Sequence, residues 1–292
     1  MPSWQGKSKA NTTGYKIFVF LIKTFGIRSA YFLLYFVAGY YFLFSPSSSK
    51  VIFHFYYHRL GFSRSKSLRK LYLNYYIFGQ TLIDKIAVMI NISSQFTFEF
   101  DGEKYLREMV EKKKGGLLLS AHIGNWEAAG HLLKRLNTRI NIVMYDGEDE
   151  QIKKYLEGVT GEKAYTIIYV KNDFSHVYKI NEALTANEIV CLHGDRFLPG
   201  NKTLSCNFLG EEALFPEGPF LLALKLKVPV VYVYAFKEAG THYHFYSTEL
   251  KYFYQSEKST LQNILIDFVE SVEKMVKSYP EQWFNYYDFW KK

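Results

Sequence analysis

The stretch from Gly115 to Leu133, GGLLLSAHIGNWEAAGHLL, brings a histidine and a carboxylate close together in the chain. Its first residues form a short apolar run that predicts a strand, and His122 follows this run at a Gly-Asn turn. Glu127 stands five positions after His122, where a helical pattern begins. A carboxylate that orients a histidine ring and stabilises its charged form makes the ring a general base. The pair therefore predicts an enzyme that deprotonates a hydroxyl or an amine, with acyl transfer as the natural reaction.

The spacing alone is weak evidence, because His244 and Glu249 repeat it in an alternating run that has no glycine turn. Residues five apart in a continuous helix are rotated by about 140° and do not share a face. His122 and Glu127 can therefore meet only if His122 lies in the strand-to-helix turn, for which Gly124 is suited. The alternative is that His122 is a hydrogen-bonded core histidine and that Glu127 is an acid favoured by the helix dipole.

Two further blocks carry candidate substrate-binding groups. In IVCLHGDRFLPG a predicted strand ends just before Asp195 and Arg196, so that Arg196 could bind a phosphate or thioester oxygen and Asp195 could orient it. In FPEGP a helix is expected to open with free N–H groups that could receive an anion. The alternatives are a surface ion pair and a plain loop-to-helix junction. The candidate substrate-binding residues are Asn125, Asp195, Arg196, Glu217 and Gly218.

The remaining pattern predicts an α/β fold with a mostly parallel central sheet, because strand-like and helix-like runs alternate. Strands are predicted at 116–120, 140–145, 164–170, 189–193 and 228–236, and a further strand at 242–250 is expected to run antiparallel. Helical runs are predicted at 50–92, 127–136, 150–158, 174–186, 219–227 and 257–279. Candidate groups then emerge at the carboxyl ends of strands, where α/β proteins place their sites.

The N-terminal region is apolar and aromatic. Residues 15–27 and 29–44 are apolar stretches separated by Arg28, and Phe and Tyr number 25 each in the whole chain. Aromatic side chains favour the membrane interface, so we expect a hydrophobic helical membrane anchor at residues 1–48 and a catalytic domain at residues 49–292. The alternatives are a buried core helix pair and an aromatic core.

Charge and motifs limit the classes of partner. The formal net charge of +8 suits anionic partners such as anionic lipid or an acidic carrier protein. No zinc finger, RNP-like or helix-turn-helix signal is present, so nucleic acid is not the expected partner. Only Cys191 and Cys206 occur, in no metal-ligand spacing. The sequence has no G-x-S-x-G elbow, no P-loop and no dinucleotide fingerprint, so we expect neither a serine hydrolase, nor a metal, nor a cofactor.

Together these blocks resemble the lysophospholipid acyltransferase superfamily, and most closely the late acyltransferases of lipid A biosynthesis. The resemblance rests on the His-x4-Glu motif from His122 to Glu127 and on the His-Gly-Asp-Arg block that ends at Arg196. It also rests on Phe-Leu-Gly and Phe-Pro-Glu-Gly before a helix, and on Pro-Glu-Gln-Trp at 280–283. The order of the blocks matches the family over roughly residues 15–290.

The resemblance implies a mechanism and a location. His122, oriented by Glu127, would take a proton from an acceptor hydroxyl, which would attack the thioester of acyl carrier protein or coenzyme A. Arg196 and nearby N–H groups would hold the acceptor phosphate or the oxyanion. The acceptor would be a lipid A precursor or a related glycolipid, and the catalytic domain would face the cytoplasm from the inner membrane.

Two departures from the family leave the acceptor open. The basic residues that often follow the tryptophan are absent after Trp283, and Pro219 stands where a related glycerophosphate acyltransferase block has threonine. A lysophospholipid, an amino-acid lipid or an aryl polyene are alternative acceptors. A non-catalytic membrane-binding protein of the same fold is the alternative from a different class.

Overall fold

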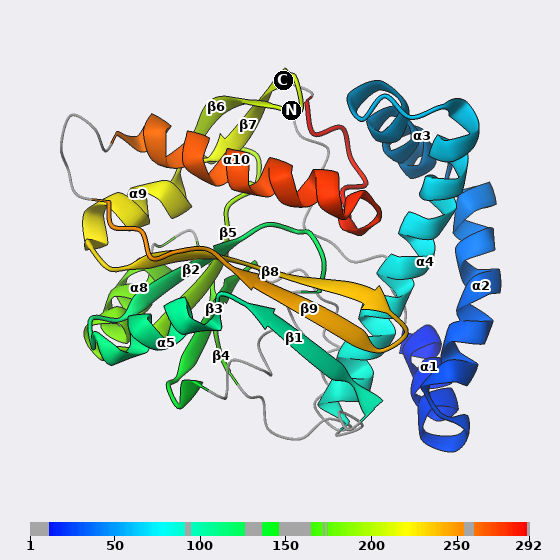
Figure 1. The fold of residues 1–292 in the computed structure, drawn as a ribbon, viewed down its shortest axis with the longest axis horizontal. Helices are drawn as coiled ribbons and strands as arrows, with labels where there is room; N and C mark the ends of the chain where they lie inside the picture. The colour runs from blue at the N-terminus through cyan, green and yellow to red at the C-terminus, as the bar shows by residue number, and fades with distance from the viewer. Residues whose placement is uncertain are drawn as a thin grey trace.

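The protein is described by a computed structural model at residues 12–90, 95–125, 136–145, 165–171, 173, 175–253 and 260–290. Within them, a seven-stranded sheet in the order β1-β9-β8-β2-β5-β3-β4 forms the centre of the molecule (Figure 1). All neighbours in this sheet run parallel except β8 and β9. A separate antiparallel hairpin is formed by β6 and β7. The prediction of an α/β fold with a mostly parallel sheet flanked by helices is confirmed.

The element bounds follow the sequence pattern closely. The strands are β1 Thr97–Asp101, β2 Gly116–Ser120, β3 Ile140–Met144, β4 Thr166–Tyr169, β5 Ile189–His193, β6 Thr203–Phe208, β7 Glu211–Pro216, β8 Val230–Ala239 and β9 His242–Ser247. The α-helices are α1 Thr12–Phe25, α2 Ile27–Phe44, α3 Pro46–His54, α4 Arg64–Met89, α5 Glu103–Glu111, α8 Ser175–Thr185, α9 Gly218–Leu226 and α10 Leu261–Ser278. A π-helical turn, Phe55–Arg59, follows α3, and a 3-10 turn, Pro280–Gln282, follows α10.

All six predicted strands are present, and β9 pairs antiparallel with β8 as expected. The prediction missed β1, α5 and the β6–β7 hairpin, and its single helical run at 50–92 is divided before Arg64, where α4 begins. Leu209 and Gly210 form the tip of that hairpin with positive φ angles of 53° and 85°. Such a turn usually carries Asn-Gly or Asp-Gly, so a leucine at its first position hides the signal. The predicted helices at 127–136 and 150–158 lie outside the described residues, except for residue 136.

The central strand β2 is buried along its whole length, and its alternating side chains face two hydrophobic layers. Leu118 packs with α5 and with Ile189 and Val231. Leu117 and Leu119 belong to the larger cluster, which also contains the buried faces of α9 and α10. A strand covered on both sides reads as a continuous apolar run, as the GLLLS segment does.

The N-terminal helices stand beside the ends of β1, β8 and β9 (Figure 1). α2 packs on α4 through Ile27, Ala30, Tyr31, Leu34 and Ala38, which are buried. Its other side carries Phe32, Phe36, Tyr40 and Phe44, which are spaced by four residues and are 58–67% exposed. Among the described residues, α2 is the one helix long and apolar enough to cross a membrane. It is therefore a two-faced helix, held to the protein on one side and aromatic on the other.

The sheet order brings together two strand ends that are far apart in the chain. β2 and β5 are parallel neighbours, and their register pairs Ser120 with His193. The residues just beyond the two carboxyl ends, His122 and Asp195, consequently leave the sheet side by side.

Candidate active site

His122 lies in a tight turn, residues 121–125, in which the backbone N–H groups from His122 to Asn125 all donate hydrogen bonds. The N–H of Ile123 donates to the carbonyl of Ala121 at 2.7 Å, which closes a three-residue turn. The N–H of Asn125 donates to Ala235 in β8 at 2.7 Å. The carbonyl of His122 accepts from Phe284 N–H at 3.3 Å. The turn is thus fixed by contacts to distant parts of the chain, as a site that must hold a reacting group requires.

Gly124 is required in this turn for two reasons. Its φ of +68° lies in the left-handed region, where a side chain is strained. A Cβ on Gly124 would also lie 2.0 Å from the carbonyl oxygen of Ala235, so the β8 backbone leaves no room for one. The glycine turn predicted after the first strand is therefore present.

Asp195 accepts two hydrogen bonds from His122. The ring Nδ1 lies 2.8 Å from Oδ1, and the backbone N–H lies 2.9 Å from Oδ2. The Asp195 side chain is 3% exposed whereas that of His122 is 27% exposed, so the carboxylate is shielded while the imidazole stays accessible. Because an ionised carboxylate only accepts hydrogen bonds, it places the proton of neutral His122 on Nδ1 and leaves the lone pair on Nε2.

His193 is a hydrogen-bond partner of that lone pair. Its Nδ1 lies 3.2 Å from His122 Nε2, and the two rings meet edge-on with centroids 4.2 Å apart. With the proton of His122 on Nδ1, His193 is the donor in this hydrogen bond. The order Asp195, His122, His193 therefore forms one chain of hydrogen bonds.

The pKa values in this chain favour an unprotonated His122. Burial lowers the pKa of His122 below its ordinary value, and Arg196 lowers it further, while Asp195 opposes both effects. Burial and the neighbouring His122 hold the pKa of His193 well below its ordinary value. Burial alone would raise the pKa of Asp195, but His122 and Arg196 lower that pKa far below its usual range. At neutral pH the site thus combines a neutral imidazole with an ionised carboxylate, which is the state of a ready general base.

The C-terminal segment after α10 braces the turn. Gln282 accepts the N–H of Gly124 through its carbonyl at 2.8 Å, and Trp283 forms an antiparallel bridge with Ile123. Arg196 donates to the carbonyl of Phe284 at 2.6 Å. The Pro-Glu-Gln-Trp block noted in the sequence is therefore part of the wall that holds His122. Sequence reasoning did not give it that role, because the contacts are made by its backbone.

The other predicted site residues do not all lie beside His122. Glu127 lies outside the described residues. Asn125 is buried, and its amide donates to Tyr243 Oη at 3.0 Å and to the carbonyl of Thr81 at 3.4 Å. Glu217 and Gly218 open α9, and Phe220 of that helix packs against Gly194, beside Asp195. Among the described residues, no hydrogen bond joins Glu217 or Gly218 to His122. The structure thus brings His122, Asp195 and Arg196 together.

Two groups of described side chains could hold a metal ion by proximity. The ligand atoms of His122, His193 and Asp195 lie within 4.8 Å of one another, as do those of Glu99, Glu238 and His242. In the first group both carboxylate oxygens of Asp195 already accept hydrogen bonds from His122. That use fits an orienting carboxylate better than a metal ligand.

Fold and site together define an α/β protein that presents a carboxylate-oriented histidine at the carboxyl end of its central strand, an arrangement suited to base-assisted group transfer. The family model of the bacterial lipid A biosynthesis acyltransferases matches residues 65–292, and the chain belongs to this family. It is accordingly an acyltransferase of the lipid A type. A search among curated proteins found no match.

Asp195→Asn should lower kcat roughly 10³- to 10⁴-fold, because an amide facing Nδ1 favours the wrong ring tautomer and no longer stabilises the imidazolium. The measurement is the initial rate of acyl transfer at saturating substrate. The matched control is Asp267→Asn on α10, which removes a carboxylate that accepts from Tyr232 at 2.7 Å. The control should keep a normal rate. A normal rate for Asp195→Asn would contradict the assignment and would leave Glu127 as the orienting carboxylate.

The value of kcat/KM should rise with pH, with a midpoint below the ordinary pKa of histidine. The active form of His122 is unprotonated and the pKa of His122 is lowered, so activity is lost only as the pH falls through a value below about 6.5. In Asp195→Asn the midpoint should move lower still, because Asp195 raises the pKa of His122. Profiles of kcat/KM between about pH 5 and about pH 8 test this point. A wild-type midpoint above the ordinary histidine value would contradict it.

Proposed function

We propose that this protein transfers a fatty acyl chain from a thioester to a hydroxyl of a lipid A precursor or related glycolipid, with His122 as the general base. The observation that carries the proposal is the Asp195–His122 pair at the end of β2, which leaves Nε2 unprotonated at an accessible position. Membership in the lipid A acyltransferase family supports the reaction class.

The proposed reaction is a single displacement. The acceptor hydroxyl takes the place of His193 at His122 Nε2 and gives up its proton there, while its oxygen attacks the thioester carbonyl. Asp195 stabilises the resulting imidazolium. When the tetrahedral intermediate collapses, the C–S bond breaks and the Nε2 proton passes to the leaving thiolate. The products are an ester and a free thiol, and no covalent acyl-enzyme is formed.

Two predicted groups complete the proposal. Glu127 is proposed as a second carboxylate near His122, on the His-x4-Glu spacing. Arg196 lies close enough to lower the pKa of His122 and is proposed to hold the acceptor phosphate or the oxyanion. Glu217 and Gly218 are retained as proposed substrate-binding residues. Asn125, which was also predicted to bind substrate, is buried, and its amide is proposed to support the turn.

The proposed donor is acyl carrier protein or coenzyme A, both of which are anionic. The net charge of +8 and the basic isoelectric point of about 9.1 support an acidic donor and an anionic lipid surface. We propose that the protein resides at the inner membrane with residues 49–292 as the catalytic domain on the cytoplasmic side. The thioester donors of this reaction class and the reduced cysteines expected from the sequence fit that compartment.

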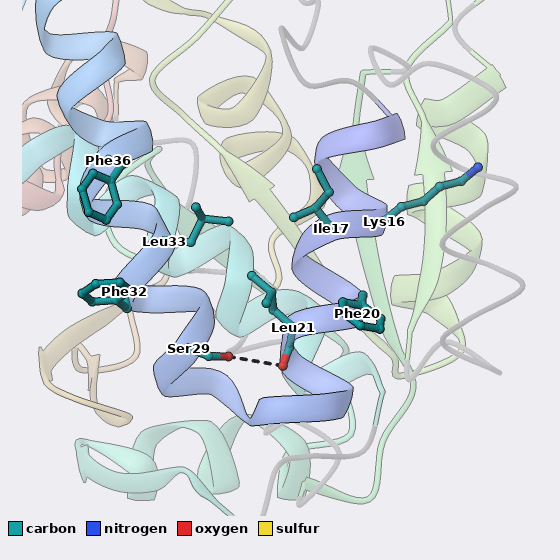
Figure 2. A pocket seen from close by; sticks show the side chains of 8 residues that line it. All are labelled: Lys16, Ile17, Phe20, Leu21, Ser29, Phe32, Leu33 and Phe36. Atoms are coloured by element: carbon teal, nitrogen blue, oxygen red, sulfur yellow. Dashed lines mark hydrogen bonds between the residues drawn. The ribbon is translucent and has the colours of Figure 1, made fainter.

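The proposed membrane attachment lies in residues 1–48. α1 and α2 enclose an apolar groove of about 640 Å³ that is lined by Ile17, Phe20, Leu21, Phe32, Leu33 and Phe36, with Lys16 and Ser29 at its margin (Figure 2). Phe20 and Phe32 are 60% and 66% exposed. A lysine beside exposed aromatic rings suits a lipid interface, where the ring enters the acyl region and the amine reaches the headgroups.

Purified protein in detergent should transfer an acyl chain to a lipid A precursor, and His122→Ala should lose nearly all transfer while remaining folded. Initial rates with labelled acyl carrier protein thioester and with labelled coenzyme A thioester show which donor the protein uses. A panel of acceptors that also contains a lysophospholipid and an amino-acid lipid measures the acceptor. If product forms only with another acceptor, the role of His122 as the base is retained and the proposed acceptor class is replaced. Transfer that persists in His122→Ala would refute the role of His122.

Replacing Phe32 and Phe36 together by serine should lower membrane binding by at least about tenfold, because each exposed ring contributes on the order of 2 kcal/mol when buried in lipid. The measurement is the fraction of protein that floats with phosphatidylglycerol vesicles. Tyr178→Ser is the control, because Tyr178 is an aromatic side chain on α8 that is 75% exposed. Flotation that is equal for the double variant and the control would contradict attachment through α2.

A further inference from the structure

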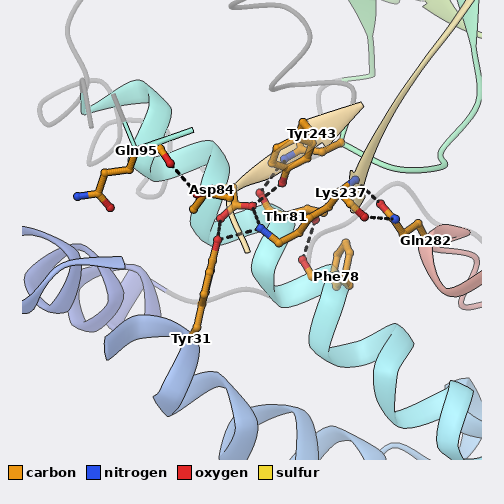
Figure 3. A network of polar contacts seen from close by, with 10 residues as sticks. Tyr31, Phe78, Thr81, Asp84, Gln95, Lys237, Tyr243 and Gln282 are labelled. Carbon is orange, nitrogen blue, oxygen red and sulfur yellow. Dashed lines mark hydrogen bonds and ion pairs between the residues drawn. The ribbon is translucent and has the colours of Figure 1, made fainter. Parts of the chain in front are cut away.

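A buried ion pair lies behind the 121–125 turn. Lys237 of β8 and Asp84 of α4 are joined at 2.6 Å between Nζ and Oδ2, and their side chains are 4% and 0% exposed (Figure 3). Each group has further hydrogen-bond partners. Tyr31 donates to Asp84 Oδ1 and accepts from Lys237 Nζ at 2.9 Å, while Tyr243 donates to Asp84 Oδ2. We call Tyr31, Asp84, Lys237 and Tyr243 the buried cluster.

The buried cluster reaches the 121–125 turn by two routes. In the first, Tyr243 Oη accepts from the amide of Asn125 at 3.0 Å. In the second, the side chain of Gln282 holds the backbone of Lys237 through bonds of 2.9 Å and 2.7 Å (Figure 3). The carbonyl of Gln282 in turn accepts from Gly124 N–H at 2.8 Å. Asn125 and Gly124 are the two residues that follow His122 and Ile123, so both routes end at the turn that carries the base.

Stability alone does not explain an ion pair at this place. Burial raises the pKa of Asp84 and lowers the pKa of Lys237, and the attraction between the two groups opposes both shifts. Removing the two charges from water is therefore costly. Apolar residues of similar volume often make such a position as stable or more stable. A fully satisfied polar network does, however, fix the geometry of the groups around it more narrowly than apolar packing.

We propose that the buried cluster is a positioning site for the His122 turn and that α2 is one of its working parts. This inference rests on the proposed function of His122. Asp84 and Lys237 set the position of Tyr243, Tyr243 holds Asn125, and Asn125 holds the turn. Tyr31 closes the cluster from α2. These four are positioning residues, because they act on the reaction through Asn125 and Gly124.

The position of Tyr31 gives α2 two roles. Its outward face carries the exposed aromatic side chains, and its inward face delivers the Tyr31 hydroxyl to Asp84 and Lys237. The helix proposed to contact the membrane therefore also completes the polar network behind the base. A shift of α2 along α4 would remove the Tyr31 hydrogen bonds from two buried charges. The position of α2 on α4 is therefore linked to the geometry of His122.

The test is acyl transfer by full-length Tyr243→Phe and Tyr31→Phe in the donor and acceptor assay used for wild type and His122→Ala. Each variant should lower kcat roughly 10- to 100-fold with KM little changed, because the turn is misplaced while the substrate surface is kept. The matched control is Tyr232→Phe on β8. Tyr232 donates to Asp267 at 2.7 Å, and Lys251 donates to Asp267 at 2.9 Å, so the same three residue types occur here. Within the described residues, no hydrogen bond joins this group to the 121–125 turn. The control should keep a normal kcat.

A double-mutant cycle separates positioning from a general loss of stability. If Tyr243 acts through Asn125, then Tyr243→Phe combined with Asn125→Ala should be no slower than Asn125→Ala alone. Effects on kcat that multiply would overturn the proposal, as would a normal kcat in Tyr243→Phe. If Asn125→Ala does not fold, Asn125→Ser takes its place in the cycle. Thermal unfolding in the same detergent confirms that every variant is folded at the assay temperature.

The outcome for Tyr31→Phe decides the part played by α2. Reduced kcat with normal vesicle flotation supports the link between α2 and the turn, whereas normal kcat overturns it. The wild-type rate keeps this proposal distinct from the proposed function. If wild type transfers no acyl chain, the function itself fails. If wild type is active and Tyr243→Phe and Tyr31→Phe have the same kcat as the control Tyr232→Phe, only the positioning role of the buried cluster fails.

Discussion

Asp195 meets both the ring and the backbone of His122, and the rest of the site depends on this double contact. A single hydrogen bond to the ring would fix the tautomer but would leave the main chain free to move. The second bond, from the His122 N–H, ties the turn to the loop after β5. Both bonds require β2 and β5 to be parallel neighbours with Ser120 opposite His193, so a change of sheet order would separate His122 from Asp195.

The C-terminal segment and the helices α4 and α2 give the 121–125 turn further support. The C-terminal segment meets the 121–125 turn from one side through Gln282, Trp283 and Phe284. It is itself held by α4, because Asn74 donates to the carbonyls of Glu281 and Trp283 at 3.0 Å and 3.1 Å. α4 is in turn covered by α2. The turn, the C-terminal segment and α4 are thus connected by hydrogen bonds although they are far apart in the sequence. Buried residues of all three, and of α2, belong to the larger hydrophobic cluster.

The sequence predicted six of the nine described strands and the glycine turn, because each of these leaves a local pattern of apolar runs and turn residues. It placed His122, Asp195 and Arg196 at strand ends correctly, but it paired Asp195 with Arg196 rather than with His122. The pairing of Asp195 with His122 depends on strand order. β5 follows β3 and β4 in the chain, but in the sheet it lies between β2 and β3. The buried cluster was missed for a similar reason, since Tyr31, Asp84 and Lys237 come from three distant elements and carry no motif.

The central claim is that neutral His122 carries its proton on Nδ1 and offers Nε2 as the base. Nitrogen NMR of protein with ¹⁵N-labelled histidine measures this directly, with His122→Ala used to assign the signals. We predict that at neutral pH His122 is the Nδ1–H tautomer, and that the fraction of this tautomer falls in Asp195→Asn. A protonated ring at neutral pH, or the Nε2–H tautomer in the wild-type protein, would contradict it.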